Sequence, residues 1–301
     1  MKKLRSKKFL IYTPLILVLL SGCTSITDGK GQVLEKYLIK LSTGFSIVFK
    51  ESWFTGLLVY PLAQVINFLD QYMNVLFAII IVTIGIKLLT LTFTIKSTVA
   101  SQKMQVIQPE MKKIQDKYAG KNDDRSKMLM GQEMNDLYKK HSINPFGTIL
   151  ITFIQLPIIF AMYQAIQRSE AVQTGTILGQ SLQKSPMYGF THLTTGGWVY
   201  VIIFVLMAVF QFLSMKMPQW LAARTQKGKV IVHPGDKAKK GNTMNTVMYT
   251  SLAMILFLSI NWPTAMSLYW LVSAFAQVGQ TLYIQHFFID KPEQTKGVKA
   301  V

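Results

Sequence analysis

The run FAIIIVTIGIKLLTLTF, residues 77 to 93, is predominantly apolar and has one charged residue near its middle, Lys87. A helix that crosses a bilayer needs about 20 predominantly apolar residues, so this run and its flanks are long enough. A lysine at the centre of such a helix costs roughly 2.5–3.5 kcal/mol on insertion scales. The run therefore predicts a membrane-spanning helix whose cation either avoids lipid or has a task inside the membrane.

The whole chain has the composition of a polytopic membrane protein. Half of its 301 residues are hydrophobic, and its formal net charge is +18. Long apolar blocks alternate with basic segments, which orient a membrane protein and face anionic lipid headgroups. This distribution argues against nucleic-acid binding, with ribosomal RNA beside an exit tunnel as the one form of that function left open.

The N-terminus, MKKLRSKKFLIYTPLILVLLSGC, combines a basic start with a short apolar run. This pattern predicts a secretory signal peptide over residues 1–22. The sequence Leu20-Ser21-Gly22-Cys23 resembles a bacterial lipobox, in which the cysteine is lipidated, for example with palmitate, and becomes the mature N-terminus. Cys23 is the only cysteine, so no internal disulfide can form. The alternative is an ordinary signal peptide with a chance cysteine.

An amphipathic segment precedes the long apolar blocks. After an extracellular linker over residues 23–52, residues 53–72 are apolar with one polar stripe made by Gln64, Asn67 and Asp70. One polar stripe favours a helix that lies in the membrane interface. An additional spanning helix is the alternative.

Five apolar stretches follow, and we expect each to span the membrane: residues 75–95, 146–166, 198–213, 244–260 and 264–287. Asn144 and Pro145 form a helix start before the second stretch. The predicted fold class is an all-α polytopic membrane protein with a five-helix core over residues 73–289. An N-terminal interfacial amphipathic helix precedes this core, and a cytoplasmic helical hairpin interrupts it.

The loops predict the orientation in the membrane. Lysine and arginine crowd residues 96–143 and 214–243, whereas only Arg168 and Lys184 lie between the second and third stretches. Basic loops face the cytoplasm. The N-terminus is then outside, as lipidation requires, and the short tail 290–301 is cytoplasmic.

The first basic segment, residues 96–143, is long enough for a helical hairpin. Methionines and isoleucines repeat at helical spacing along it, as at Met104, Ile107, Met111 and Ile114. An unbranched methionine edge can accept varied apolar partners. Packing of the two helices against each other is the alternative.

Polar residues recur at helical spacing inside three stretches: Thr83, Lys87, Thr90 and Thr94 in the first, Gln155 and Gln164 in the second, and Ser273, Gln277 and Gln280 in the fifth. Each stripe alone could serve interhelical hydrogen bonds. Together with a lysine they predict a shared hydrophilic cavity. No Asp or Glu occurs in the five stretches, so Lys87 could receive an anion from a visiting molecule. Snorkelling of Lys87 to the cytoplasmic interface is the alternative.

The sequence predicts no enzyme, metal or cofactor. The four histidines are scattered, without metal-ligand spacing: His141, His192, His233 and His286. Phosphate-binding loops, HExxH and GxSxG are absent from the sequence. A Ser/Lys dyad with Lys87 would need a depressed lysine pKa, which a wet cavity opposes.

The chain resembles the YidC/Oxa/Alb membrane-protein insertases, most closely the lipoprotein form of Gram-positive bacteria. The resemblance covers roughly residues 57–288 and includes YPL at 60–62, QPEMKKIQDKY at 108–118, INPFG at 143–147, QLPIIFAMY at 155–163 and WPTAMSLYWLVS at 262–273. It implies a groove that is open to the cytoplasm and lipid and closed on the outside. Lys87 matches the family's single groove cation, commonly arginine, and Gln155 and Trp270 match groove-lining positions. Thr83, Ser273 and Gln277 join them through the stripe pattern.

The resemblance implies a function in inserting and folding nascent membrane proteins. The groove cation would ease the transfer of short acidic extracellular tails of these substrates. The general Sec translocon, the ribosome through the basic loops, and anionic lipids are candidate partners. A transporter of small solutes or anions that uses Lys87 as its binding charge is the alternative, although the chain lacks the internal repeat usual in transporters.

Overall fold

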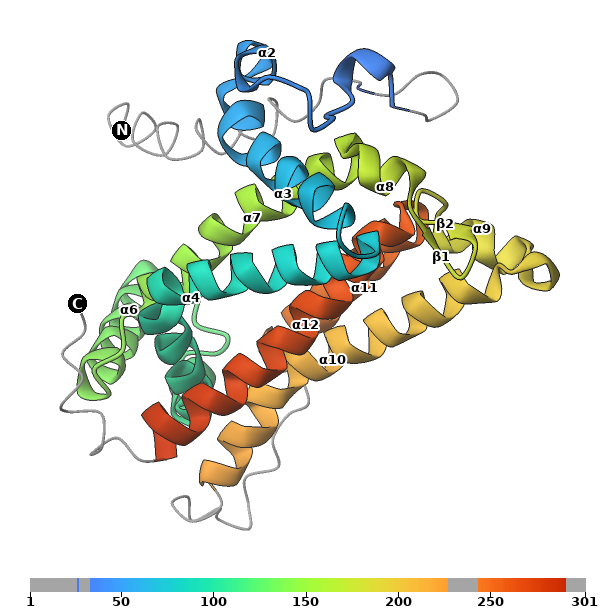
Figure 1. Ribbon diagram of the computed structural model, residues 1–301. Helices are drawn as coiled ribbons and strands as arrows, with labels where there is room; N and C mark the ends of the chain where they lie inside the picture. The colour runs from blue at the N-terminus through green and yellow to red at the C-terminus, as the bar shows by residue number, and fades with distance from the viewer. Residues whose placement is uncertain (1–25, 27–32, 227–242, 291–301) are drawn as a thin grey trace. The chain divides into compact units, whose positions relative to one another are not determined.

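The computed structural model describes residue 26, residues 33–226 and residues 243–290 (Figure 1). The predicted signal peptide, Cys23 and residues 291–301 of the predicted tail lie outside the described residues. Within the described ranges the protein is almost entirely helical, as the predicted fold class requires.

The helices and strands follow one another in this order: α2 (Phe45–Glu51), α3 (Tyr60–Asp70), α4 (Val75–Val106), α5 (Gln108–Lys117), α6 (Asp124–Lys140), α7 (Pro145–Arg168), α8 (Glu170–Thr174), β1 (Thr176–Ile177), β2 (Gln180–Ser181), α9 (Pro186–Thr191), α10 (Trp198–Gln226), α11 (Thr243–Asn261) and α12 (Thr264–Ile284). Single 3-10 turns occur at Glu35–Tyr37 and Leu193–Thr195, and π-helical turns at Thr55–Val59 and Gln285–Asp290. The two strands pair antiparallel in a small hairpin, with Thr176 opposite Ser181.

The chain divides into two compact units. The first contains the described parts of Met1–Thr83 together with Ile154–Val205 and Leu258–Tyr269, and the second contains the described parts of Ile84–Phe153, Leu206–Phe257 and Trp270–Val301. Each of the five long helices is divided between the units, with one part in the first unit and the other part in the second: α4, α7, α10, α11 and α12.

In the first unit, the N-terminal segment packs on the end of α7. Ile39, Val48, Phe54, Val59, Ala63, Ala161 and Ala165 form one buried apolar cluster. Ile39 also pairs with Ser169 as an isolated parallel bridge, and its N–H donates to the Arg168 carbonyl at 2.7 Å. Apolar burial and backbone pairing together fix this segment.

In the second unit, α5 and α6 pack around a small core of their own. Ile107, Leu137 and Ile143 are buried there, and Met104, Met111 and Ile114 pack against them. These side chains therefore pack within the helical hairpin, which is the alternative that the sequence left open for them. Met128 and Leu129 of α6 remain exposed.

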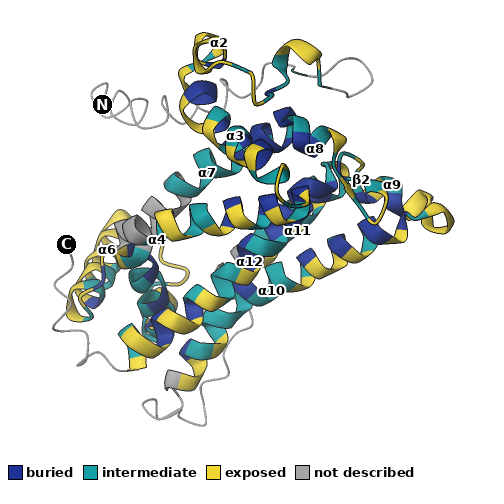
Figure 2. Cartoon of the chain, in the orientation of Figure 1, coloured by how far each residue is buried: buried dark blue, intermediate teal, exposed yellow. Residues whose placement is uncertain are grey.

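The polar stripe of the helix α3 faces other parts of the protein. Asn67 is 5% exposed, and its amide bonds to protein groups rather than facing water. Gln64 Nε2 donates to the carbonyls of Lys40 and Thr43. The exposed side of α3 carries Val65 and Phe68 instead, and exposed residues run along α3 in Figure 2. Periodicity identified the two faces of α3 but not what each face contacts.

One helix among the described residues, Trp198–Arg224 of α10, is long and apolar enough to cross a membrane by itself. The two parts of α4, Val75–Leu91 and Ile95–Val106, would add a second if their 80° bend lies within one span. The count of five spans remains a prediction.

The boundary of α10 differs from the sequence prediction. The predicted span ended at residue 213 and a basic loop began at 214, but α10 continues to Gln226. The residues after 213 include strong helix formers such as Met, Leu and Ala, and the helix accommodates Pro218. The first part of the predicted loop is therefore helical.

Candidate functional site

Lys87 lies on α4 and is half-buried. Ile86 and Lys87 are intermediate in exposure, whereas Leu88 and Leu89 are exposed. None of the ion pairs among the described residues involves Lys87. Within the part of the chain that the structure describes, this ammonium therefore has no carboxylate partner.

The threonines of the α4 stripe bond to their own helix. Thr83 is fully buried, and its hydroxyl donates to the Ile79 carbonyl at 2.7 Å. The Thr90 hydroxyl donates to the Ile86 carbonyl at 2.8 Å. Such bonds to the preceding turn satisfy a hydroxyl proton inside an apolar helix.

The polar side of α12 meets α4 beyond the bend. Gln280 Nε2 donates to the Thr98 hydroxyl at 3.3 Å, and Gln102 Nε2 donates to the Thr281 carbonyl at 3.4 Å. The oxygens Gln102 Oε1 and Thr281 Oγ1 are buried without a hydrogen-bond partner among the described residues. The polar contact between α12 and α4 is thus in the Ile95–Val106 part of α4, after Lys87 and after the stripe predicted on this helix.

The other predicted groove residues are divided between the units. Trp270 and Ser273 of α12 are buried and Gln277 is half-buried, and all three belong to the second unit with Lys87. Thr83 and the half-buried Gln155 belong to the first unit. The assembly of these six residues into one groove stays a prediction.

Histidine and acidic side chains form no group that could hold a metal ion within the described ranges. His141 lies 3.3 Å from a Glu110 carboxylate oxygen, and His192 stacks on the Tyr188 ring at 3.9 Å. Both histidines therefore have contacts within their own segments.

A buried polar cluster at the end of α7 was not predicted from the sequence. Arg168 Nη2 lies 2.8 Å from Glu51 Oε2, and Arg168 Nε donates to the Tyr37 carbonyl at 2.7 Å. Burial lowers the pKa of Arg168, and the charge of Glu51 opposes this shift. The available signal was a lone arginine directly after an apolar run in a predicted extracellular loop, where the positive-inside rule does not place one.

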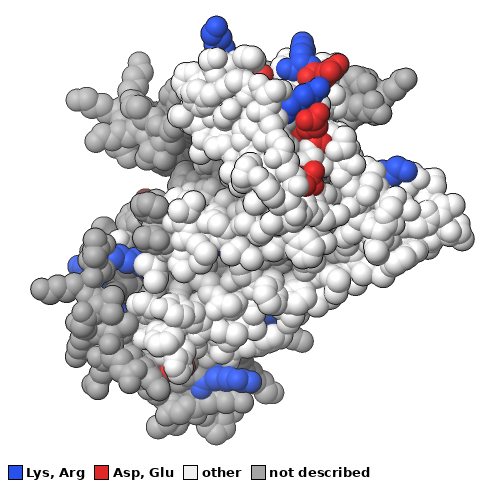
Figure 3. All heavy atoms as spheres, viewed as in Figure 1, with Lys and Arg blue, Asp and Glu red and all other residues white. Residues whose placement is uncertain are grey.

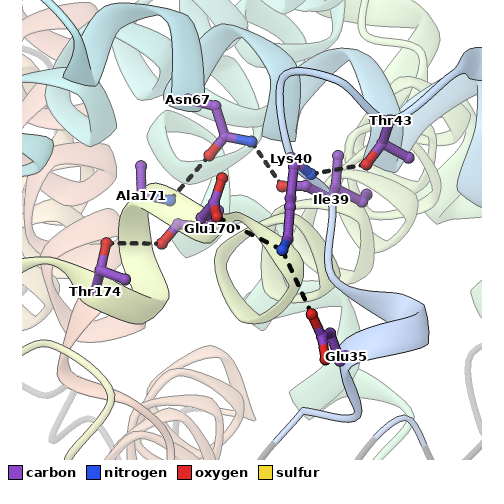
Figure 4. Close-up of polar contacts among 8 residues, drawn as sticks. All are labelled: Glu35, Ile39, Lys40, Thr43, Asn67, Glu170, Ala171 and Thr174. Carbon is purple, nitrogen blue, oxygen red and sulfur yellow. Dashed lines mark hydrogen bonds and ion pairs between the residues drawn. The ribbon is translucent and has the colours of Figure 1, made fainter.

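Asn67 connects three parts of the first unit in this cluster. Its Nδ2 donates to the Ile39 carbonyl at 2.7 Å, and its Oδ1 accepts from the Ala171 N–H at 3.0 Å, as Figure 4 shows. The Ser169 hydroxyl donates to the same oxygen. Lys40 Nζ lies between Glu35 and Glu170 in the same view, at 3.5 and 3.9 Å. In Figure 3 positive and negative side chains lie together in the upper part of the view, and further charged atoms appear at its left and at its bottom, with broad uncharged areas between them.

Comparison with known proteins places the chain in a family. The model of the 60Kd inner membrane protein family matches residues 66–291. Membrane protein insertase YidC 2 of Listeria innocua serovar 6a is 33% identical over 298 residues, covering 97% of this chain and 88% of that protein. Membrane protein insertase YidC 1 of Streptococcus pyogenes serotype M3 is 35% identical over 233 residues, covering 77% and 74%.

A third relative, membrane protein insertase YidC of Enterococcus faecalis, is 31% identical over 242 residues, which are 80% of this chain and 78% of that protein. These matches agree with the resemblance found in the sequence motifs. The chain belongs to the 60Kd inner membrane protein family, the family of the YidC proteins.

Proposed function

We propose that this protein is a membrane protein insertase that helps nascent membrane proteins enter and fold in the bacterial cell membrane. The observation that carries the proposal is the similarity over 97% of the chain to a protein named membrane protein insertase. The lone cation Lys87 within an apolar stretch supports it. The protein needs no catalytic group for this task, because the substrate's own apolar burial drives its exit into lipid.

The proposed architecture has five spanning helices, formed by α4, α7, α10, α11 and α12. In it α3 lies in the outer interface, and α5 and α6 form a cytoplasmic hairpin. Cys23 carries the lipid anchor outside, and the C-terminus is cytoplasmic. The exposed apolar side chains of α3 support an interfacial position, because they would contact lipid while the polar stripe contacts protein.

In the proposed mechanism, Lys87 offsets the cost of moving an acidic tail across the hydrocarbon core. An Asp at mid-span costs roughly 2.5–3.5 kcal/mol. A lysine about 4 Å from it, at an effective dielectric constant near 20, returns about 4 kcal/mol. One cation can therefore compensate for the passage of one carboxylate. Thr83, Gln155, Trp270, Ser273 and Gln277 would line the hydrophilic groove that holds this pair.

The nascent chain is the proposed substrate, and the Sec translocon, the ribosome and anionic lipids are the proposed partners. The names of the relatives favour insertion over the transport of solutes or anions. Uptake of labelled anions by purified protein in liposomes would revive the transporter alternative.

The experiment that tests the proposal compares Lys87→Ala with Lys87→Arg in a strain that lacks other insertases. We expect Lys87→Ala to impair insertion of substrates with acidic tails and Lys87→Arg to preserve it. Lys96→Ala is the matched control, because Lys96 lies on the same helix and is exposed. Full insertion by Lys87→Ala would contradict a role for the groove cation, and failure of insertion by the unsubstituted chain would contradict the function itself.

A further inference from the structure

The short helix α9 packs along the first turns of α10. The Tyr188 ring meets the Tyr200 ring edge to face at 6.1 Å, and the Phe190 ring meets the Phe204 ring edge to face at 6.2 Å. Gly189 lies between these two contacts. A Cβ at Gly189 would lie 2.6 Å from the Gly197 carbonyl oxygen. The backbones of α9 and of the residues before α10 are thus in direct contact.

These contacts place α9 at a defined depth along α10. Phe204 is six residues beyond Trp198, the first residue of α10, which corresponds to about 9 Å at 1.5 Å per residue. Trp198–Arg224 is the helix that is long and apolar enough to cross a membrane. Tryptophan is enriched at membrane interfaces, so Trp198 marks the start of the crossing segment. Interfacial helices penetrate roughly 5–10 Å, which matches the depth of Phe190.

The exposed residues of this segment include three large apolar side chains, beside the polar residues Thr191, His192, Thr194 and Thr195. Met187 is 46% exposed, Phe190 43% and Leu193 50%. Trp198 and Ile202 at the start of α10 are exposed as well, and Phe190 contacts Phe204 of the same helix. Single exposed apolar residues are ordinary, but a contiguous group of large ones marks an interaction surface.

The charge of the segment suits a membrane surface. No Asp or Glu occurs between Glu170 and Asp236. Lys184 is exposed at the start of the segment, with its Nζ 4.0 Å from the centre of the Tyr188 ring. A single cation beside an apolar surface, without acidic neighbours in sequence, is complementary to lipid phosphates.

The segment is also held in place from the opposite side. The Lys184 carbonyl accepts hydrogen bonds from both the N–H and the hydroxyl of Thr264, the first residue of α12, at 2.9 and 2.7 Å. The Ala265 N–H donates to the Leu182 carbonyl at 3.1 Å. These bonds hold the residues directly before α9, and the contacts with α10 hold α9 itself.

We propose that residues 184–198, with α9 at their centre, lie in the outer leaflet of the membrane as an interfacial anchor. Met187, Phe190 and Leu193 contact the upper acyl chains, and Lys184 contacts lipid phosphate. The partner is the bilayer itself. This inference rests on the membrane crossing of α10 and is independent of insertase activity.

The test measures the membrane depth of spin labels on the full chain in liposomes that contain phosphatidylglycerol. Labels are placed by Met187→Cys and Leu193→Cys, with Ile202→Cys as the lipid control and Thr176→Cys, an exposed strand position, as the water control. The unsubstituted chain is labelled in parallel to subtract any reaction at Cys23. Collision rates with oxygen, which partitions into lipid, and with a water-soluble nickel chelate are compared.

We expect the oxygen-to-nickel ratios at Met187 and Leu193 to match that at Ile202 and to exceed that at Thr176 several-fold. Ratios at Met187 and Leu193 equal to that at Thr176 would overturn the proposal. A fall in the nickel collision rate at Met187 and Leu193 that occurs only when another protein is added would also overturn the proposal, because it would assign the surface to a protein partner. A water-like ratio at Ile202 would remove the premise that α10 crosses at this depth. Insertion activity is not part of the readout, so failure of the proposed function would not affect these results.

Discussion

The guanidinium of Arg168 and the carboxylate of Glu51 form an ion pair of 2.8 Å in which only 2% of the arginine side chain is exposed. This pair joins the end of α7 to the end of α2, and the Tyr37 carbonyl accepts a further bond from Arg168. Arginine keeps its positive charge on burial. Its neighbours must therefore provide a negative charge and hydrogen-bond acceptors in place of the water that is lost. The N-terminal segment provides both.

Arg168→Ala should destabilise the first unit. The substitution leaves the Glu51 carboxylate and the Tyr37 carbonyl without their partner, and breaking a buried pair costs about 3–5 kcal/mol. We expect a loss at the lower end of this range, because 26% of the Glu51 side chain is exposed to solvent. The midpoint of SDS-induced unfolding measures the loss. Lys184→Ala, at the other basic residue between α7 and α10, should change it little, and an unchanged midpoint for Arg168→Ala would contradict this assignment.

Asn67→Ala should loosen the contact between α3 and the start of α8. It removes the donor to Ile39 and leaves the buried Ala171 N–H unsatisfied, at a cost of about 1–3 kcal/mol. Limited proteolysis of the N-terminal segment measures the effect, with faster cleavage expected. Gln71→Ala is the control, since Gln71 is exposed directly after α3. Equal cleavage of the two variants would show that the Asn67 bonds do not hold the segment.

The contact between α5 and α6 should depend on pH at both ends of the scale. The hydrogen bond from Lys117 lowers the pKa of Glu133 below its usual 4.5, and the bond to Glu133 raises the pKa of Lys117 above its usual 10.5. The glutamate contribution is present above pH 4.5 and is lost as pH falls through its lowered pKa. The lysine contribution is present below pH 10.5 and is lost as pH rises through its raised pKa.

Distances between spin labels at Lys113→Cys and Asn135→Cys measure this dependence, because both positions are exposed on α5 and α6. We expect a narrow distribution between the two limits and a broader one outside them. Glu133→Gln should remove the change in the width of the distribution at low pH. High salt should weaken the pH dependence, because the ion pair is exposed. A distribution in Glu133→Gln that still broadens in acid would point to other groups.

Gly189→Ala should destabilise the packing of α9 on α10. The added Cβ would lie 2.7 Å from Tyr200 Cβ as well as near the Gly197 carbonyl, and overpacking of this kind costs about 1–3 kcal/mol. Gly279→Ala is the matched control, because a Cβ there has nothing within 4 Å and alanine favours a helix by about 1 kcal/mol. Thermal unfolding in detergent should therefore shift in opposite directions for the two variants. A stabilised Gly189→Ala would contradict the close approach.

Local signals in the sequence predicted the start of α7 and the break between α11 and α12. The Asn144-Pro145 pair predicted a helix start, and α7 begins at Pro145. Trp262 and Pro263 separate α11 from α12, in the gap between the predicted stretches 244–260 and 264–287. Such boundaries depend on the backbone preferences of a few neighbouring residues, which the sequence displays directly.

Contacts between distant segments could not be predicted in this way. The polar stripe of α3 was visible, but the carbonyl that Asn67 bonds to belongs to Ile39, and its other partners follow α7. Between β2 and α9, the carbonyls of Leu182 and Lys184 accept bonds from Ala265 and Thr264 of α12, which lie about 80 residues further along the chain. The same holds for the candidate site. The composition of the apolar stretch identified Lys87 as a charge without an acidic neighbour. The periodicity of the polar residues could not show that Gln280 of the α12 stripe bonds to Thr98 of α4.

The bond between Arg168 and Tyr37 joins residues that are 131 positions apart. At about 5–20 residues per second, a ribosome takes roughly 7–25 s to synthesise the chain between them. During that interval the Tyr37 carbonyl and the Ile39 N–H have only water as a partner for the bonds that the end of α7 later provides. The N-terminal segment is therefore among the first parts of the chain to be made but can complete its folding only after α7 has been synthesised.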